Sequence, residues 1–572
     1  MFDHGHVRIH SYCGACGFRF DPGDKIVALV GRDGSFEAAR PAGAFAAACH
    51  CDNTHGHSWI FCRHIRCRQC VGGPESATLH ADCLSVFQAR SLAVDAESSL
   101  ARLWIAAAWK SPWLGAPALH LLPSVDVLAG LGHAAAAWNL PQLPQLPPEL
   151  ASMIHQRSRH SPLWRYSLVS ELACALSEAA NCEIPTVCLN SVECWQRGQP
   201  LKTAKATHDC ADDSLVRITI DSRGIQRIER LPAEELQSSV PQLQSNSITY
   251  VVEEAKALIG VKVEFQLQYA RLILHPGSKG FKIWDTPSPP SLQKWTINPT
   301  IPPCRLRTIH LRNCFALTFF VSSGSTLAIH GHTRQRPFAQ STFDTLWPLQ
   351  QRFAAWVYVP IPKGIAALGL RNSRGPFRPQ TNLLVYTESA GAVFMGSSPQ
   401  RGFAGTEITQ SPVILAYQLP RIGAITSVWV YSDSPTTTQS PVPPLENVPP
   451  LESPSFSSLT LQHVLEIATF HDAETMMCRG VLVRYENSSL RALGQCKLGT
   501  DIRRDIKRPT HLCYASTVMV HGGRELRAAR VETSNNGAHQ HNEEGWTCCA
   551  MMGFLKCWFS HSELILSSSN EI

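Results

Sequence analysis

Cysteine and histidine pairs between residues 13 and 83 constrain the fold of this chain more than any other feature. The pairs are Cys13-x-x-Cys16, Cys62-x-His64, Cys67-x-x-Cys70 and His80-x-x-Cys83. Zinc takes four such ligands at the corners of a tetrahedron, with Zn–S distances of ~2.3 Å and Zn–N distances of ~2.0–2.1 Å. Two intervening residues let one tight turn aim both donors at one ion, and Gly14 and Gly17 favour that turn in the first pair. The spacing therefore predicts a zinc-binding module over residues 1–90.

Eight ligands are enough for two zinc ions, and the spacing leaves the grouping open. In a crossed arrangement, one ion is held by Cys13, Cys16, Cys67 and Cys70, and the other by Cys62, His64, His80 and Cys83. In a one-ion alternative, Cys13, Cys16, Cys67 and Cys70 form a zinc ribbon, and His80 and Cys83 have a structural role without metal. Cys49, Cys51, His55 and His57 are further donors for a second site. Two alternatives need no metal: buried reduced cysteines, or disulfides in an oxidising compartment.

The order of the pairs resembles RING-type and related cross-braced or treble-clef-like zinc modules. This resemblance implies structural zinc, with one or two Zn²⁺ ions as the cofactor. In the RING family, an apolar residue in the first knuckle and a later Pro or Trp recruit a ubiquitin-conjugating enzyme. Ala15 and Pro74 are the residues at the corresponding places here. A RING-like ubiquitin ligase is therefore one alternative function.

Residues 91–195 are predicted to form a helical region with a Pro-rich linker. Apolar residues at helical spacing predict helices over 85–109 and 164–182. Between them, the stretch from Leu146 to Leu150, with Ile154 four residues later, resembles the opening of an F-box. That resemblance implies an adaptor that binds the small linker subunit of a cullin ubiquitin ligase. The other interpretation is a plain helical connector, because Pro followed by Glu begins many helices.

The apolar period switches to two from about residue 215. Val216, Ile218 and Ile220 alternate with polar residues before the turn at Asp221–Gly224, which predicts a hairpin. Similar strands and turns continue, so residues 215–432 are predicted to be a β-rich domain of the sandwich, barrel or prism type. Residues 433–458 are predicted to be a Pro/Ser/Thr-rich linker, and residues 459–567 a second β-rich domain. The expected fold class is α+β and multidomain, with antiparallel sheets.

Two phrases in the β-rich part, Trp356–Pro362 and Arg491–Cys496, are similar to uncharacterised fungal multidomain proteins. That resemblance carries no known activity. The glycine-punctuated strands are also similar to jacalin-type β-prism lectins, so sugar binding is a further alternative.

Charge and hydropathy exclude several partner classes. The net charge of +6 is spread over 572 residues without a basic run that interleaves aromatic residues, so no nucleic-acid surface is predicted. The N-terminus lacks the charged start and apolar run of a signal peptide, and no window approaches ~20 apolar residues. We therefore expect no membrane span and an intracellular protein, nuclear or cytoplasmic, whose 21 cysteines are reduced.

Two other groups of donors are weaker metal candidates. His330-x-His332 has no acidic or cysteine partner nearby in the sequence, and a histidine pair on a strand is expected to be exposed. His539-x-His541 precedes Cys548-Cys549, but adjacent cysteines in a strand point to opposite faces. Nucleophile elbows, phosphate loops and His-Glu-x-x-His motifs do not occur in the sequence. The sequence therefore predicts a non-catalytic protein that binds an unidentified protein partner and contains structural zinc.

Overall fold

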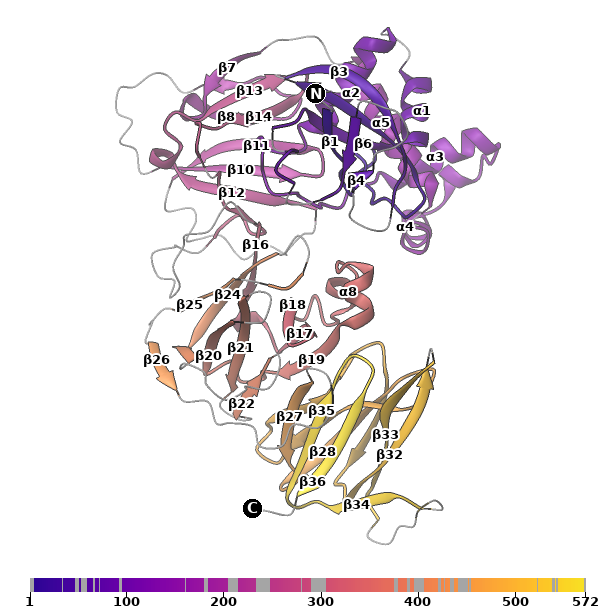
Figure 1. Cartoon of the computed structure of the whole chain (residues 1–572), viewed down its shortest axis with the longest axis vertical. Helices are drawn as coiled ribbons and strands as arrows, with labels where there is room; N and C mark the ends of the chain where they lie inside the picture. Colours follow the sequence, from indigo (N-terminus) through magenta and orange to yellow (C-terminus); the bar gives the residue numbers. More distant parts are fainter. Residues whose placement is uncertain are drawn as a thin grey trace. The chain divides into compact units, whose positions relative to one another are not determined.

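The computed structural model describes residues 5–569 with internal gaps. The gaps are residues 33, 47–50, 53–58, 65–66, 71, 92–94, 160, 179–183, 204–213, 233–246, 279, 290–304, 375–378, 388–390, 396–405, 420–422, 426, 433–436, 441–450, 452–453, 522, 537–540 and 542–543. The chain forms two compact units: Met1–Pro289 with Ile301–Arg305, and Pro290–Thr300 with Leu306–Ile572. Both units contain mainly antiparallel sheets, so the β-rich class is confirmed (Figure 1).

The N-terminal part of unit 1 contains two small sheets and a helix. One sheet has the order β1-β5-β4, and the other has the order β3-β2-β6. Their bounds are β1 (Gly5–Arg8), β2 (Lys25–Arg32), β3 (Ser35–Ala44), β4 (Cys51–Asp52), β5 (Trp59–Cys62) and β6 (Glu75–His80), followed by α1 (Ala81–Arg90). Strand β2 is central and buried from Ile26 to Gly31, as its continuous apolar run dictates. Strand β1 pairs with β5 in parallel, which places Arg8 opposite Cys62.

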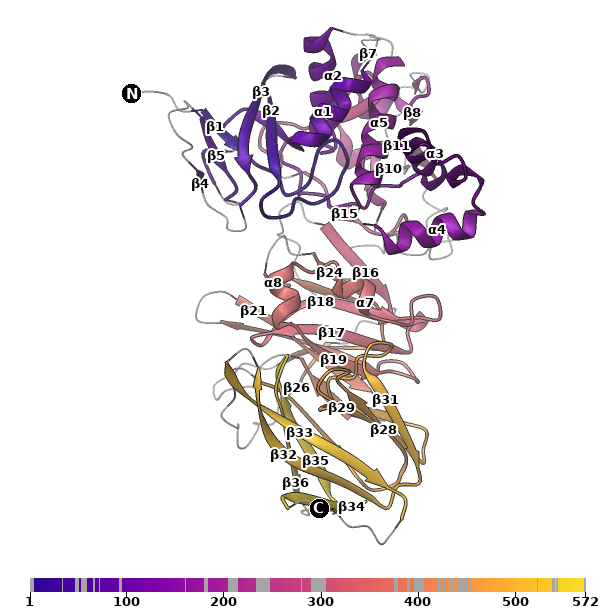
Figure 2. The same ribbon diagram turned by 90° about the vertical axis from the view of Figure 1, so that its right-hand side faces the viewer.

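Helices follow this module. Their bounds are α2 (Ala96–Ala108), α3 (Val127–Trp138), α4 (Pro148–Arg157) and α5 (Pro162–Glu178). The helix predicted over 85–109 is divided into α1 and α2, because the Asp95 side chain accepts a hydrogen bond from the Ser98 N–H and begins a new helix there. Helices α1, α2 and α5 pack together and share a core with the N-terminal sheets (Figure 2).

The rest of unit 1 is β-structure. Strands β15-β12-β10-β11-β8-β9 are neighbours in one sheet, and β14-β13-β7 form another. Their bounds are β7 (Ile184–Cys188), β8 (Val192–Gln196), β9 (Lys202–Thr203), β10 (Leu215–Asp221), β11 (Gly224–Leu231), β12 (Thr249–Glu254), β13 (Lys262–Gln266), β14 (Tyr269–Ile273) and β15 (Ile283–Trp284). The hairpin predicted at Asp221–Gly224 is confirmed as β10–β11, and Gly224 has the positive φ that its turn needs.

The described strands of unit 2 before residue 441 pair in three groups. Their strand orders are β16-β24-β25, β18-β17-β19 and β22-β21-β20-β23-β26. The bounds are β16 (Arg305–His310), β17 (Ala316–Ser322), β18 (Ser325–His332), α7 (Gln340–Phe343), α8 (Pro348–Phe353), β19 (Ala355–Pro360), β20 (Ala367–Arg374), β21 (Pro379–Thr387), β22 (Gly391–Phe394), β23 (Thr406–Gln410), β24 (Pro412–Gln418), β25 (Val428–Ser432) and β26 (Thr437–Ser440).

Two further sheets complete unit 2. One has the order β27-β35-β36, and the other has the order β31-β28-β29-β33-β32-β34 with β30 beside β29. The bounds are β27 (Ser455–Thr460), β28 (Val464–His471), β29 (Cys478–Tyr485), β30 (Leu490–Gly494), β31 (Ile502–Lys507), β32 (His511–His521), β33 (Arg524–Ser534), β34 (Trp546–Ala550), β35 (Phe554–Phe559) and β36 (Leu564–Ser569). One hydrophobic core runs through unit 2 from Ile309 to Leu566.

These boundaries differ from the expected domains in three places. The region 215–432 is divided between the units, and its second part shares a core with residues beyond 454. The region 91–195, expected to be helical, ends in strands β7 and β8, where β-branched Thr186, Val187 and Val192 favour extended backbone. Strand β26 lies within the expected linker 433–458 and pairs with β23, and β27 begins within the same segment.

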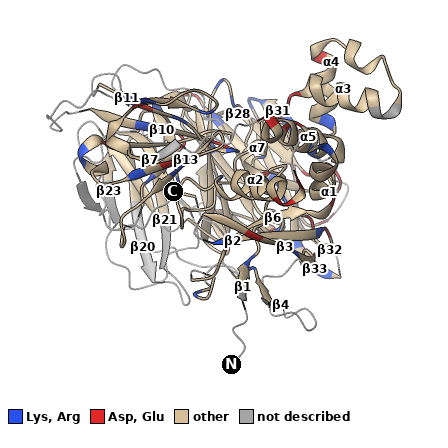
Figure 3. Cartoon of the chain, turned by 90° about the horizontal axis from the view of Figure 1, so that it is seen from above, with Lys and Arg blue, Asp and Glu red and all other residues tan. Residues whose placement is uncertain are grey.

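Positions of Lys, Arg, Asp and Glu are spread along many of the described elements rather than concentrated in one segment (Figure 3). Helix α3 carries no Lys, Arg, Asp or Glu. Among the described residues, no helix combines the length and the hydropathy needed to span a membrane.

Candidate metal centres

Four donors from the predicted module converge in the interior of unit 1. They are Cys13, Cys16, His80 and Cys83, and one ligand atom from each lies within 4.8 Å of the others. All four side chains are buried. We call this group the inner centre.

A tight turn aims the two sulfurs of Cys13 and Cys16 in one direction. The Gly17 N–H donates to the Cys13 carbonyl at 2.9 Å, and the Cys13 N–H donates to the Phe18 carbonyl at 2.8 Å. Gly17 closes the turn with φ +77°, a conformation that side chains disfavour. A Cβ atom at Gly14 would lie 2.6 Å from the Cβ of Ala107 in α2. Glycine at both positions is therefore required by the turn and by its close packing on α2.

The other two donors lie at the start of α1. His80 ends β6, where it pairs with Ile26 of β2, and it is also the residue that precedes the first turn of α1. Cys83 lies in that first turn and faces back toward the cysteine turn. The amino end of a helix carries partial positive charge, which favours a thiolate there. The β6–α1 junction thus supplies two ligands at a fixed spacing.

The interatomic distances in the inner centre match those around a zinc ion. For Zn–S of ~2.3 Å and Zn–N of ~2.0–2.1 Å, a tetrahedron places sulfur and nitrogen about 3.6 Å apart. The Nδ1 atom of His80 lies 3.6 Å from the Sγ atoms of both Cys16 and Cys83. The backbone N–H of His80 also donates to the sulfur of Cys13, at 3.5 Å.

The opposite side of the His80 ring faces a carboxylate. Its Nε2 atom lies 3.3 Å from Oδ2 of Asp24, and its ring packs against Phe20 with centroids 4.4 Å apart. Histidine ligands of zinc commonly donate their second N–H to a carboxylate, which fixes the tautomer and orients the ring. Asp24 is therefore placed to hold His80 with Nδ1 toward the sulfurs.

Ionisation of one thiol of the inner centre disfavours ionisation of the other two, so the three thiols compete for one negative charge. Burial opposes ionisation of Cys13, but hydrogen bonds from Cys16, Cys83 and His80 lower the pKa of its thiol well below the usual value. Burial raises the pKa of Cys16, and hydrogen bonds with Cys13 and Cys16 raise that of Cys83. A divalent cation held by these residues would remove this competition, because each sulfur would then ionise against the metal charge.

A second group of donors, the outer centre, alternates with the inner one along the sequence: one member precedes Cys13, and the other three lie between Cys16 and His80. It contains His6, Cys62, Cys67 and Cys70, whose ligand atoms also lie within 4.8 Å of one another. The Nδ1 atom of His6 lies 3.1 Å from the sulfur of Cys70 and 3.8 Å from that of Cys67. His6 and Cys62 are buried, whereas Cys67 and Cys70 are partly exposed. These residues are suited to hold a second zinc ion nearer the surface.

The grouping differs from the crossed arrangement predicted from the sequence. The antiparallel pairing of β6 with β2 carries His80 and Cys83 to the Cys13–Cys16 turn, so Cys67 and Cys70 belong to the other group. His64 is exposed and lies in neither group, and Cys49, His55 and His57 lie outside the described residues.

The sequence analysis missed His6, which occupies the place expected of His64. The parallel pairing of β1 with β5 brings His6 near Cys62. A His-rich start, with His4 and His6, was the available signal, but nothing local predicts a parallel pairing between strands so far apart in the sequence.

The pair His330 and His332 on β18 is buried rather than exposed. Nδ1 of His330 lies 2.7 Å from Oγ1 of Thr342, and Nε2 of His332 lies 2.7 Å from Oγ1 of Thr318. The remaining ring nitrogens donate to the carbonyls of Arg336 and Pro337. Burial lowers the pKa of His330 to about 3 and that of His332 to about 4. Both rings are therefore neutral core residues with hydrogen-bond partners.

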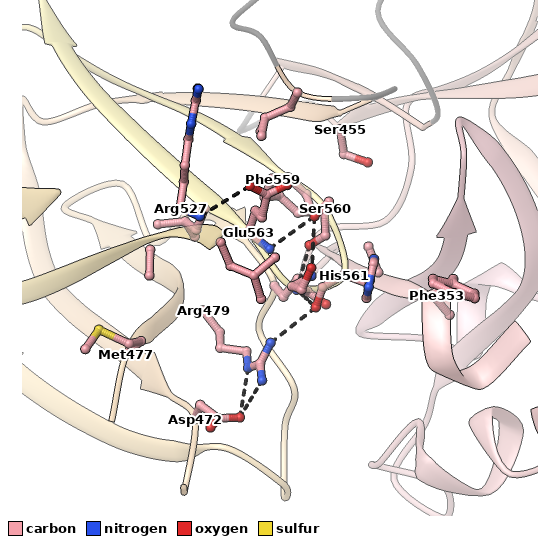
Figure 4. A pocket seen from close by; sticks show the side chains of 18 of the residues that line it. Phe353, Ser455, Asp472, Met477, Arg479, Arg527, Phe559, Ser560, His561 and Glu563 are labelled. Carbon is pink, nitrogen blue, oxygen red and sulfur yellow. Dashed lines mark hydrogen bonds and ion pairs between the residues drawn. The ribbon is translucent and has the colours of Figure 1, made fainter. Parts of the chain in front are cut away.

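Unit 2 also contains an open cavity of about 1640 Å³, seen in Figure 4. Arg479 lies at its wall, pairs with Asp472 at 2.5 Å and donates to the His561 carbonyl at 3.2 Å. The Glu563 carboxylate accepts from the Arg527 N–H at 3.2 Å. These charged groups are thus paired with one another or with the backbone around the cavity.

No protein-family model matches the sequence, and no curated protein matches it either.

Proposed function

We propose that this chain is a non-catalytic protein-binding protein whose N-terminal module is built on two structural zinc ions. The inner centre has a treble-clef-like plan: a cysteine turn, a β-hairpin formed by β2 and β3, and a helix that begins with the last two ligands. Both centres offer four protein donors, which leaves no coordination position for a reacting water. Zinc in such sites stabilises the fold rather than performing hydrolysis.

Apolar side chains on α4 carry the protein-binding part of this proposal. Leu150, Met153 and Ile154 are 46%, 55% and 38% exposed. They lie within one turn of a short helix, whereas single exposed apolar residues elsewhere need no explanation. Ala151 of the same helix is buried, so α4 presents one face to the protein and another to solvent.

An F-box-type substrate adaptor is the second candidate function. The resemblance rests on Leu146–Leu150 and Ile154, and such a motif requires a compact unit of three helices with an exposed apolar face. Helices α3, α4 and α5 pack around Leu131, Ala151 and Trp164, and Leu146 packs against that cluster. The partner implied by this candidate is the linker subunit of a cullin ubiquitin ligase.

The surroundings of the cysteine turn favour these candidates over a RING-like ligase. Ala15 is only 8% exposed, and Gly14 lies against Ala107 of α2. An apolar knuckle residue that recruits a ubiquitin-conjugating enzyme needs to be accessible. The β-prism lectin alternative would use the cavity of unit 2, but the Arg479 and Asp472 side chains in its wall are already paired with each other.

A binding assay with purified full-length chain and the cullin linker subunit tests the adaptor. We expect the wild-type chain to retain the subunit and the Met153→Glu/Ile154→Glu variant to lose at least 10-fold in affinity, about 1.4 kcal/mol. Gln156→Glu is the matched control, because it adds a negative charge at another exposed position of α4. Equal binding by wild type and the double variant, or none by wild type, would contradict the adaptor.

A lysate pull-down in which the double variant loses no partner would contradict the use of α4 for protein binding.

A further inference from the structure

A third group of metal-ligating side chains lies in unit 2, far along the sequence from the N-terminal centres. It contains Cys513 on β32, Cys548 on β34 and His541 from the segment between β33 and β34. One ligand atom from each lies within 4.8 Å of the others. Strands β32, β33 and β34 are labelled at the C-terminal end of the chain in Figure 1.

The strand register places the two sulfurs on one face of the sheet. Cys513 is directly opposite Cys548 on one side and directly opposite Glu532 of β33 on the other. Side chains of directly opposed residues lie on the same face, with Cβ atoms about 4.5–5.5 Å apart. Cys549 points to the other face, where it joins the hydrophobic core. The adjacent cysteines thus have separate roles, and Cys513 is the partner that the sequence analysis did not name.

The third donor is held by packing against neighbouring groups. The His541 ring stacks on Trp546 with centroids 4.3 Å apart and an interplanar angle of 7°. Its Nδ1 atom lies 3.5 Å from Oε2 of Glu532, and the side chain is 12% exposed. Arg530 contacts the same Trp546 ring at 5.6 Å from the centroid. The imidazole is therefore fixed beside the sulfurs, with a carboxylate next to one of its nitrogens.

We propose that Cys513, Cys548 and His541 bind a zinc ion at the surface of this sheet. Glu532 acts as the carboxylate that orients His541, a role that resembles that of Asp24 beside His80. Zinc takes four ligands, so three protein ligands leave one coordination position open. Cys548 is exposed, so water or a donor from a partner can reach that position. This site differs from the inner centre, where four buried donors close the shell.

The alternative for this pair of cysteines is a cross-strand disulfide between Cys513 and Cys548. Neither cysteine is disulfide-bonded in the structure. A disulfide uses two sulfurs and gives His541 no role, whereas a zinc site uses all three groups. The two are distinguished by metal content and by mass.

Zinc content of the purified full-length chain tests the proposal. We expect Cys548→Ser and His541→Ala to contain one zinc fewer per chain than the wild type, whatever the number bound at the N-terminal centres. Cys174→Ser, which removes an exposed cysteine on α5, is the control and should retain the wild-type number. Far-ultraviolet circular dichroism checks that each variant is folded.

Cobalt substitution gives a second readout. The wild-type minus Cys548→Ser difference spectrum should contain thiolate-to-cobalt charge-transfer bands from one site. Equal zinc content in the wild type and both variants overturns the proposal. An intact mass 2 Da below the reduced value, with a peptide that links Cys513 to Cys548 in protein purified without oxidant, also overturns it.

Discussion

Buried histidines serve different purposes in the two units. In unit 1, Nδ1 of His80 faces the sulfurs of Cys16 and Cys83. In unit 2, both nitrogens of His330 and of His332 face hydroxyl or carbonyl oxygens. A neutral imidazole needs one hydrogen-bond donor and one acceptor as partners, so His330 and His332 need no metal ion. In unit 1, one nitrogen of His80 faces the Asp24 carboxylate and the other faces thiols, an arrangement that is suited to hold a metal ion.

The largest expected effect comes from breaking the inner centre. Cys83→Ser should release one zinc and lower the free energy of unfolding of unit 1 by about 4 kcal/mol or more, because structural zinc contributes much of the stability of such modules. Cys70→Ser in the outer centre should also release one zinc but cost less, about 1–2 kcal/mol, since its side chain is partly exposed. Hydrogen exchange read by mass spectrometry should report faster exchange in peptides of β2 and β6.

Peptides of β17 and β18 are the internal control for that experiment, because His330 and His332 need no metal. If chelation or Cys83→Ser accelerated exchange in β17 and β18 as much as in β2, the contrast between the two kinds of buried histidine would be wrong.

The next effect concerns pH and the histidines of unit 2. Their folded pKa values, about 3 and about 4, lie below the ordinary value of ~6.5, so the unfolded chain takes up protons first as the pH falls. The two neutral histidines therefore contribute their full stabilisation to the folded state above pH ~6.5. This contribution to the free energy of unfolding is lost as the pH falls toward ~4, and at pH ~5.5 the loss is about 2–3 kcal/mol for the pair. Hydrogen exchange of β17 and β18 measures this loss. The His330→Gln/His332→Gln variant should be less stable at pH 7 yet show little of this slope, and an equal slope in that variant would assign the titration to other groups.

The smallest effect concerns the carboxylate beside His80. Asp24→Asn should weaken zinc binding at the inner centre by about 10–100-fold, because the side chain that orients the ligand loses its charge. Competition with a chromophoric chelator measures this affinity. Asp82→Asn, an exposed change in the first turn of α1, is the control. If both variants bound zinc as tightly as the wild type, Asp24 would have no role in positioning His80.

The sequence predicted much of this because several signals are local. A Cys-x-x-Cys turn followed by glycine, the β10–β11 hairpin and the antiparallel β-rich class each depend on neighbouring residues. The grouping of the ligands does not, since it depends on which strands pair. The parallel contact of β1 with β5 and the antiparallel contact of β6 with β2 decide that His6 replaces His64 and that Cys67 and Cys70 join Cys62.

The contacts of the histidines and cysteines of unit 2 were missed for the same reason: they depend on residues that are distant in the sequence. The threonines that satisfy His330 and His332 lie 12 and 14 residues away in the sequence. Cys513 lies on a different strand from Cys548, and only the register of β32 with β34 brings them together. Periodicity identifies strands but does not say which strands become neighbours.

The order in which the donors of the two centres occur along the chain has a consequence for biosynthesis. Translation completes the set His6, Cys62, Cys67 and Cys70 before His80 and Cys83 are made. A nascent chain can therefore load its more exposed ion first, and that ion would hold β1 against β5 before His80 and Cys83 have emerged from the ribosome. The buried ion then closes the module last, as soon as the start of α1 has emerged.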